Sequence, residues 1–328
     1  MSPADRHPLR RASLRVGGLA VTIAILALGC GSPAPPRIDR FAVTPSPAGP
    51  SLEAEASGGP AAAPSVGPLP EPSANTGNRL PIQTVSANWP PAAQSTPDPN
   101  FVLHVPILMY HRIIAPADAG PSLPGLVIDP MVFAQELAML HDAGWHTITL
   151  ATLELDLAHG LRPAPRTFVI TIDDGHLDGL THALPILERF GDVATYFVVL
   201  GRIHDPGFLS STDLQTLAGA GMEIADHTMN HANVGRLHGF ALDFQIGAAA
   251  SAIQAITGRA SSTFAYPSGE SSLEAAGVIE AKGMGMAVTT KEGVLETWSD
   301  RFFVPRMRVS PSVTPEMLLR KMTGYAVD

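Results

Sequence analysis

Cysteine is nearly absent from this chain: its 328 residues include a single one, Cys30. One thiol closes no disulfide within the chain and builds no thiolate metal site, so both are excluded. Basic residues are outnumbered, with 21 against 30 acidic ones, and no basic run occurs beyond the extreme N-terminus. A formal net charge of −9 without a basic patch argues against a nucleic-acid partner.

Long apolar runs are also scarce, and the clearest one is short and lies near the N-terminus. Several arginines within residues 6–15 precede an apolar segment at 16–28, which is shorter than a usual membrane-spanning helix. A basic start, a short apolar segment and small residues after it are typical of an export signal. An ordinary signal peptide and an uncleaved membrane anchor both fit this pattern.

The end of this apolar segment adds a third alternative. Residues 26–30, Leu-Ala-Leu-Gly-Cys, resemble a bacterial lipobox, in which the peptide is cut before the cysteine and the cysteine is lipidated. The resemblance implies a signal peptide at 1–30, lipidation of Cys30, and an exported protein. Such a protein would be anchored to the membrane by lipid and would face the cell envelope or the exterior.

Residues 31–100 are dominated by proline, alanine, serine and glycine. Such a composition buries too little apolar surface to offset the entropy lost on ordering, so we expect a disordered tether. As a flexible coil of about 70 residues it would reach on the order of 45–50 Å. That length suits a domain held away from a membrane and acting on a surface polymer.

Residues 101–328 alternate between strand-like and helix-like patterns without a repeat of fixed period. Strands are expected at 105–111, 146–150, 167–172, 194–200, 222–225, 263–266, 285–290 and 302–309. Helices are expected at 129–142, 152–159, 176–189, 211–218, 240–257, 272–282 and 314–323. This alternation predicts a single α/β domain, either a parallel barrel or a doubly wound sheet.

Two carboxylates follow one of the most apolar of these strands. Asp173 and Asp174 come directly after residues 168–172, and α/β proteins place their chemistry at the C-terminal ends of strands. Because adjacent side chains on an extended backbone point opposite ways, the two carboxylates can do different work. The alternative is an ordinary Asp-Asp-Gly turn that caps the next helix.

A pair of histidines follows another short strand. His227 and His231 have the i, i+4 spacing that places two side chains on one face of a helical turn, close enough to share a metal ion. Neutral imidazoles suit zinc and its neighbours, and a carboxylate would complete a three-ligand site. Two unrelated surface histidines are the alternative, but the shared strand-end position with Asp173 and Asp174 favours a metal site.

Three short segments together resemble a known family. Residues 171–175 (Thr-Ile-Asp-Asp-Gly), 227–231 (His-Thr-Met-Asn-His) and 264–269 (Phe-Ala-Tyr-Pro-Ser-Gly) resemble, in order and spacing, the first three motifs of the polysaccharide deacetylases. These are carbohydrate esterases with a NodB-homology domain. The resemblance covers roughly residues 101–325 and implies an irregular (β/α) barrel as a single catalytic domain.

The resemblance also implies roles for the residues of the first two motifs. Asp173 corresponds to the general base, and Asp174, His227 and His231 correspond to the ligands of a divalent metal. Zinc is expected first, with cobalt or nickel as alternatives. A carboxylate that does not ligate the metal is free to accept a proton from the attacking water.

The third motif and its departures carry further expectations. In the family, the backbone N–H after the motif's proline stabilises the oxyanion; here this is Ser268, with Tyr266 placed beside it on the substrate side. Ala265 stands where the motif often has an arginine that orients the base. Arg306, in the strand expected at 302–309, could supply that charge instead, or be a surface arginine.

The family also uses a histidine as general acid, often near the C-terminus, but the last histidine here is His238. Residues 106–112, Pro-Ile-Leu-Met-Tyr-His-Arg, resemble the circularly permuted subgroup that deacetylates poly-N-acetylglucosamine, in which the acid comes from the N-terminal strand. His111 is therefore the candidate acid, with a loop-capping histidine as the alternative. Asp226, just before the first ligand histidine, would hold a ligand ring or cap the turn.

These expectations favour a lipid-anchored, metal-dependent N-deacetylase whose partner is an acetylated amino-sugar polymer of the cell surface. O-deacetylation of acetylated xylan or another polysaccharide would use the same site. An inactive barrel that only binds surface polysaccharide is a third alternative, which the complete set of acid, base and ligand residues disfavours.

Overall fold

The computed structural model describes residue 98, residues 100–120 and residues 124–325. The predicted signal peptide, Cys30 and nearly all of the predicted tether lie outside these residues. Within them, the order of strands and helices follows the predicted alternation closely.

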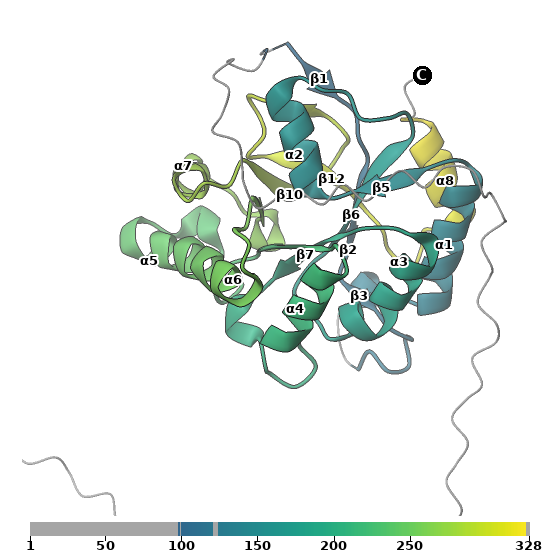
Figure 1. Ribbon diagram of the computed structural model, residues 1–328, viewed down its shortest axis with the longest axis horizontal. Coiled ribbons are helices and arrows are strands. Elements are labelled where there is room, and N and C mark those ends of the chain that lie inside the picture. The colour runs from purple at the N-terminus through teal and green to yellow at the C-terminus, as the bar shows by residue number, and fades with distance from the viewer. Residues whose placement is uncertain (1–97, 99, 121–123, 326–328) are drawn as a thin grey trace, which may run out of the picture. The chain divides into compact units, whose positions relative to one another are not determined.

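Seven parallel strands form a closed barrel (Figure 1). In spatial order these are β2 (Ile107–Tyr110), β12 (Val304–Arg308), β10 (Met286–Glu292), β9 (Thr263–Ala265), β8 (Glu223–Asp226), β7 (Thr195–Val198) and β6 (Thr167–Ile172). The ring closes because β6 also pairs with β2, in register from Ile107 with Val169 to Tyr110 with Ile172. An eighth strand, β5 (His146–Ile148), pairs with the first half of β6. The barrel, rather than the open doubly wound sheet, is therefore the architecture.

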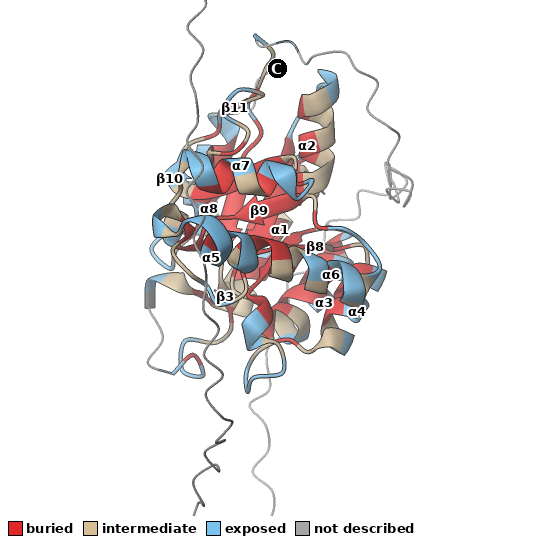
Figure 2. Cartoon of the chain, turned by 90° about the vertical axis from the view of Figure 1, so that its left-hand side faces the viewer, coloured by how far each residue is buried: buried red, intermediate tan, exposed pale blue. Residues whose placement is uncertain are grey.

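Helices surround this barrel on its outer face. They are α1 (Pro130–Asp142), α3 (Leu184–Phe190), α4 (Ser211–Gly219), α5 (Gly239–Asp243), α6 (Ala249–Thr257), α7 (Leu273–Ala281) and α8 (Pro315–Thr323). Figure 2 shows exposed surfaces on the outer sides of the helices and buried strands behind them. Two short strand pairs, β1 (Val102–Leu103) with β11 (Glu296–Thr297) and β3 (Arg112–Ile113) with β4 (Val127–Ile128), were not predicted. Two residues are too few to show a periodic pattern.

One helix lies across an end of the barrel instead of along its side. Helix α2 (Leu150–His159) buries Leu150, Leu153 and Leu157 in the same apolar cluster as Val169 and Val304, which face the barrel interior. The amides of Leu150 and Ala151 donate to Thr195 and Glu223, the first residues of β7 and β8, so α2 closes the end where the strands begin. The opposite end of the barrel, where the strands end, is not covered by α2, and it is where a functional site is expected.

The alternation of side chains along the strands decides which residues reach that site. In β6, Phe168, Ile170 and Ile172 join the cluster beneath the outer helices, whereas Val169 belongs to the interior cluster. Continuing this alternation, Asp173 points inward above Val169. The strand ends therefore place polar side chains on top of an apolar barrel interior.

The long helix expected at 240–257 is present, with a π-helical turn, η5 (Phe244–Ala248), between α5 and α6. The combined helix, Gly239–Thr257, is the one among the described residues that is long and apolar enough to cross a membrane by length and composition. Its buried residues recur at helical spacing: Leu242, Ile246, Ala249 and Ile253. This pattern is that of an amphipathic helix packed on a domain.

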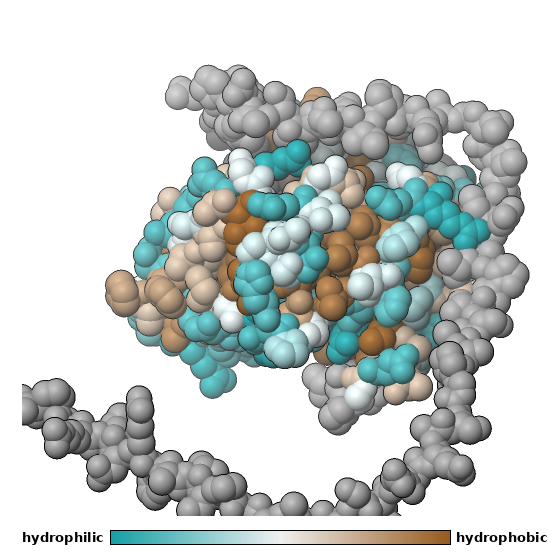
Figure 3. All heavy atoms as spheres, turned by 60° about the horizontal axis from the view of Figure 1, so that its bottom comes forward, coloured by the Kyte–Doolittle hydropathy of each residue, from teal (hydrophilic) through white to brown (hydrophobic). Residues whose placement is uncertain are grey.

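The outer side of α5 and α7 exposes large apolar side chains. Phe240 is 85% exposed and Leu273 is 83% exposed, and the rings of Phe240 and Phe244 stack with centroids 6.4 Å apart. In Figure 3, apolar residues of the visible face appear in separate groups between hydrophilic ones, including a pale brown group at the left edge.

Candidate active site

A buried ion pair lies at the centre of the strand ends. Arg306, on β12, donates from Nη1 and Nη2 to the two carboxylate oxygens of Asp173 at 2.8 and 2.7 Å. Both side chains are essentially inaccessible to solvent. The guanidinium also donates to Thr171 Oγ1 and to the Thr289 carbonyl, so its donors are satisfied on several sides. Arg306 therefore fixes the orientation of Asp173.

This ion pair sets the charge of Asp173. Burial alone would raise the pKa of the carboxyl group, but the charge and hydrogen bonds of Arg306 outweigh burial, and the pKa lies below its ordinary value. Asp173 is consequently ionised at neutral pH. A buried carboxylate in this state has the charge that a general base needs.

Beside Asp173, a carboxylate and two imidazoles converge. Asp174 Oδ1 lies 3.5 Å from Nε2 of His227 and 3.5 Å from Nε2 of His231. One ligand atom from each residue falls within 4.8 Å of the others, which is the spacing of a metal-binding triad. His227 Nδ1 lies 2.8 Å from the Ala265 carbonyl and must donate to it, so the lone pair of its ring is on Nε2, facing Asp174. The donor set and its orientation fit a divalent metal of the zinc type.

Unusual backbone conformations present these ligands. Asp174, Thr228 and His231 have positive φ angles of 78°, 70° and 55°, which non-glycine residues rarely adopt. The prediction that His227 and His231 lie on one helical turn is therefore wrong in its geometry, because residues 227–231 form a turn and loop in which the two rings nevertheless meet. Likewise Asp174 departs from the extended backbone of β6, so it faces the histidines from the loop.

Gly175, the glycine of the first motif, leaves no room for a side chain and has a backbone angle that favours glycine. Gly175 has φ 77°, and a Cβ there would come within 2.9 Å of Val198 Cγ1. This close approach lets the loop after β6 fold back over β7. It explains why the Asp-Asp pair is followed by glycine.

His111, which directly follows β2, also lies beside Asp173. Its Nε2 is 3.9 Å from Asp173 Oδ2, and its side chain is only 13% exposed. Burial lowers the pKa of His111, and the neighbouring carboxylates of Asp173 and Asp174 oppose this only in part. The predicted acid and the predicted base are thus brought together, with His111 closer to solvent than Asp173.

Of the third-motif residues, Ser268 lies in a turn after β9, whereas Tyr266 is buried outside the barrel. Ser268 has φ 57°, and its carbonyl accepts a hydrogen bond from Thr290 Oγ1. The substrate contact predicted for Tyr266 needs correction: its side chain is fully buried in the apolar cluster outside the barrel and stacks on Phe303 with ring centroids 6.2 Å apart. Tyr266 points outward because it directly follows Ala265, which faces inward.

Asp226 caps a turn. Its Oδ1 accepts from the Thr228 amide at 2.6 Å, while the ring of His227 is held by the Ala265 carbonyl. The structure thus favours the turn-capping alternative for Asp226 over a role in holding the ligand ring.

Two further residues lie in this site without having been assigned a role from sequence. His176 Nε2 is 3.9 Å from Asp174 Oδ2, and its ring packs on Phe208 with centroids 4.4 Å apart. Asp178 is buried and contacts the segment that follows His111. Both lie within five residues of Asp173, and this closeness to the first motif was the one feature of the sequence that could have pointed to them.

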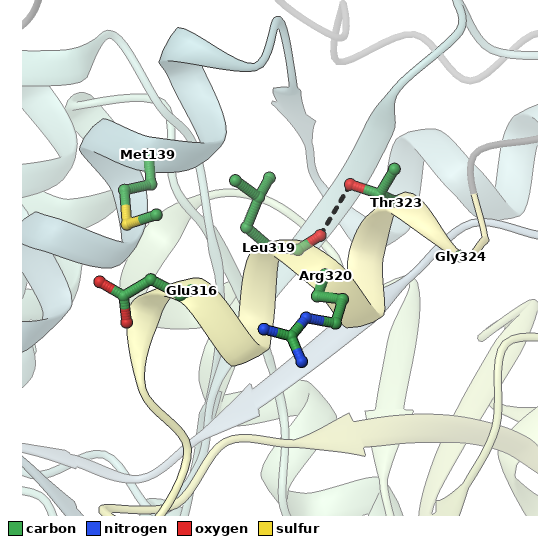
Figure 4. Close-up of a pocket in the computed structure, with 6 residues that line it drawn as sticks. All are labelled: Met139, Glu316, Leu319, Arg320, Thr323 and Gly324. Carbon is green, nitrogen blue, oxygen red and sulfur yellow. Dashed lines mark hydrogen bonds between the residues drawn. The ribbon is translucent and has the colours of Figure 1, made fainter.

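A separate cavity of about 560 Å³ lies between α1 and α8 on the outside of the barrel (Figure 4). It is lined by Met139, Glu316, Leu319, Arg320, Thr323 and Gly324. None of the predicted acid, base or ligand residues belongs to it. The strand-end cluster, with its converging charged groups, is therefore the better candidate site.

Comparisons with known proteins agree with this geometry. Residues 160–287 match the family model described as polysaccharide deacetylase. The Bacillus subtilis protein YxkH, whose name assigns it to the polysaccharide deacetylases, is 28% identical over 210 residues, covering 64% of this chain and 73% of YxkH. The chain therefore contains a polysaccharide deacetylase domain, and its barrel is of the NodB (β/α) type.

Solved structures share the fold. The Streptococcus pyogenes deacetylase PplD, solved in complex with acetate, superposes with a TM-score of 0.62 at 24% identity, covering 67% of this chain and 98% of PplD. A de-N-acetylase from Aggregatibacter actinomycetemcomitans gives 0.58 at 17% identity, covering 66% and 99% of the two chains. His111 and Arg306 lie outside the segment matched by the family model, so it is the fold that brings them to the site.

Proposed function

We propose that this protein is a metal-dependent N-deacetylase that acts on an acetylated amino-sugar polymer, of the poly-N-acetylglucosamine or cell-wall type, at the cell surface. The observation that carries the proposal is that Asp173 lies beside two different groups. Arg306 pairs with its carboxylate and lowers its pKa, and Nε2 of His111 lies 3.9 Å from its Oδ2. Hydrolysis of an amide needs both a base and an acid.

We assign the metal to Asp174, His227 and His231, whose ligand atoms already converge. When bound there, a divalent ion supplies Lewis acidity toward the acetyl carbonyl and lowers the pKa of a water molecule. Asp173 is not one of these ligands. Both of its oxygens accept hydrogen bonds from Arg306, so its carboxylate is oriented for proton transfer and does not bind the metal.

The remaining steps belong to the protein's own residues. Asp173 accepts the proton of the attacking water, and Arg306 keeps its carboxylate oriented. The backbone N–H of Ser268 donates to the oxygen of the former carbonyl. His111 donates a proton to the sugar nitrogen as the carbon–nitrogen bond breaks, so that the products are acetate and a free amine.

The position of His111 favours an N-acetyl over an O-acetyl substrate. An amine is a poor leaving group and must be protonated as it departs, whereas an alkoxide leaving group depends less on a proton donor. A shared fold with a de-N-acetylase is consistent with this preference.

We further propose that lipidation of Cys30 anchors the protein and that residues 31–100 hold the domain away from the membrane. The lipobox-like residues 26–30 and the proline-rich composition support this placement. A tethered hydrolase would meet a polymer of the envelope rather than a small metabolite.

The test is acetate release by the purified domain from N-acetylglucosamine oligomers and from acetylated xylan, with metal-depleted and zinc-, cobalt- or nickel-loaded protein. The proposal predicts metal-dependent release that is fastest from the N-acetylated oligomers. Faster release from xylan would indicate an O-deacetylase. Polymer binding with no release from either substrate would indicate a binding module.

A further inference from the structure

The segment that follows β6, residues 173–178, also forms hydrogen bonds with the residues that flank His111. The Asp173 amide donates to the Tyr110 carbonyl at 3.0 Å, immediately before His111 in the sequence. Five residues later, Asp178 Oδ1 accepts from the Ile113 amide at 2.9 Å, two residues after His111. His111 is therefore bracketed by two hydrogen bonds that come from residues 173–178.

Asp178 has a second contact with the same strand. Its Oδ2 accepts from Arg112 Nε at 2.5 Å, so both carboxylate oxygens are used by the two residues that follow His111. Asp178 is 4% exposed. The Arg112 side chain is 16% exposed, and a charge-assisted hydrogen bond between two largely sequestered groups is shorter and stronger than a neutral one.

The backbone carbonyl of Ile113 is held by a residue that closely follows Asp178 in the chain. His182, in the π-helical turn η2 (Gly179–Ala183), donates from Nδ1 to the Ile113 carbonyl at 2.9 Å. Asp178 and His182 thus hold both backbone polar groups of one residue, Ile113. The helix that begins after the Asp-Asp-Gly turn therefore fixes the course of β3 directly behind His111.

We propose that Asp178 is a positioning residue for the general acid: by holding Arg112 and the Ile113 amide, it sets the place of His111 relative to Asp173. Asp178 touches neither substrate nor reacting atoms in this role. The proposal rests on the proposed function, because it assigns the acid to His111. It implies that one continuous segment, 173–178, supplies the base, a metal ligand and the residue that aligns the acid.

The test compares Asp178→Asn and Asp178→Ala with a control variant at Asp192. Asp192 is also 4% exposed and also pairs with neighbouring side chains, accepting from Thr147 Oγ1 at 3.0 Å and contacting His141 Nε2 at 3.1 Å. It precedes β7 and so lies at the opposite end of the barrel from the site. Asp192→Asn therefore reports the general cost of losing a buried carboxylate.

We expect the Asp178 variants to bind metal as the unmodified protein does. Their kcat/KM on an N-acetylglucosamine oligomer should fall by about 10-fold or more, with a smaller loss on nitrophenyl acetate, whose leaving group needs little protonation. In a His111→Asn background the same substitutions should cause no further loss, because the acid they align is gone. Equal losses on the two substrates, or an undiminished loss in the His111→Asn background, would overturn the proposal.

A second readout separates this proposal from the proposed function. In ¹⁵N spectra of the histidine rings, with the His111 signals assigned from His111→Asn, Asp178→Ala should shift or broaden those signals and Asp192→Asn should leave them unchanged. Unchanged His111 signals in Asp178→Ala would overturn the positioning role even if the enzyme were active. Absence of amide hydrolysis in the unmodified protein, with the expected spectral change, would overturn the proposed function alone.

Discussion

Arg306 and Asp173 are 133 residues apart in the chain, yet they form the most completely buried ion pair at the strand ends, with two parallel hydrogen bonds of 2.8 and 2.7 Å. A planar guanidinium is the side chain best suited to this bidentate contact. The pair gives the inward-facing carboxylate a fixed orientation and a counter-charge in a site that water barely reaches. The charge and hydrogen bonds of Arg306 are the largest influences that oppose burial and keep the pKa of Asp173 low.

We predict that Arg306→Ala destabilises the domain by about 3–5 kcal/mol, because it leaves the carboxylate buried without its partner. Arg306→Lys should recover part of that stability but little activity, since an ammonium makes no two-pronged contact. Chemical denaturation and acetate release measure the two effects. Arg308 lies on the same strand and is exposed, so Arg308→Ala is the control and should change neither. A stable, active Arg306→Ala variant would contradict the assigned role.

We predict that Asp174→Ala, His227→Ala and His231→Ala each greatly reduce bound zinc or cobalt and abolish turnover. Each removes one of three ligands that converge within 4.8 Å. Metal content by mass spectrometry and the visible spectrum of the cobalt form report this loss independently of activity. His238→Ala, which removes an exposed histidine paired with Glu274, is the control. Stoichiometric metal in a variant that carries all three substitutions would refute the assignment of these residues as metal ligands.

We predict that the acidic limb of the kcat/KM profile against pH shifts when the concentration of free metal changes. Burial lowers the pKa of His227, but hydrogen bonding to Asp174 and the charge of Asp173 outweigh burial and raise it above its ordinary value. Below that pKa, protons compete with the metal for Nε2. Raising free zinc should therefore shift the acidic limb to lower pH. A limb that is independent of zinc would mean that another group controls it.

Glu136 makes a stability prediction away from the site. Its carboxyl group accepts a hydrogen bond from Tyr110, and burial raises its pKa to about 8. Between the ordinary value of about 4.3 and 8, the folded state binds the proton more tightly than the unfolded state, so stability falls as pH rises through this interval. Glu136→Gln should flatten that dependence in denaturation curves measured from pH 5 to 8. An unaltered slope would contradict the assignment.

Most of the fold was predictable because its strands and helices are long enough to show a period, and the strand at 167–172 was predicted to the residue. The motif residues were predictable because each set is contiguous in sequence. Arg306 was harder, since its inward direction depends on the alternation along β12 and on its position above Val304. Tyr266 was assigned wrongly because one step along β9 turns a side chain from the interior to the outer cluster.

Two kinds of feature had no adequate signal. The positive φ angles of Thr228 and His231 are uncommon for residues other than glycine, above all for a β-branched threonine, so the sequence did not indicate them. Asp178 looked like an ordinary residue at the start of a helix, and its hydrogen bonds reach 65 and 66 residues back along the chain. Its role follows from the pairing of β2 with β6, which the sequence pattern alone does not specify.

The anchor is testable separately. If Cys30 is lipidated, Cys30→Ser should move the full-length protein from the membrane fraction to a soluble or precursor form, because a lipid chain would then be the main attachment. Fractionation and intact mass measure the change. A variant that stays with the membrane at unchanged mass would indicate an uncleaved helical anchor.

The role of His111 as general acid is tested most directly by the kcat/KM of His111→Asn on two substrates, an N-acetylglucosamine oligomer and nitrophenyl acetate. We predict retained metal and fold, a loss of roughly 10²–10⁴-fold on the amide, and a much smaller loss on the activated ester. This contrast arises only if His111 donates the proton to the leaving amine. Equal losses on the two substrates would show that His111 merely contacts substrate, and no loss on either would contradict its role as the acid.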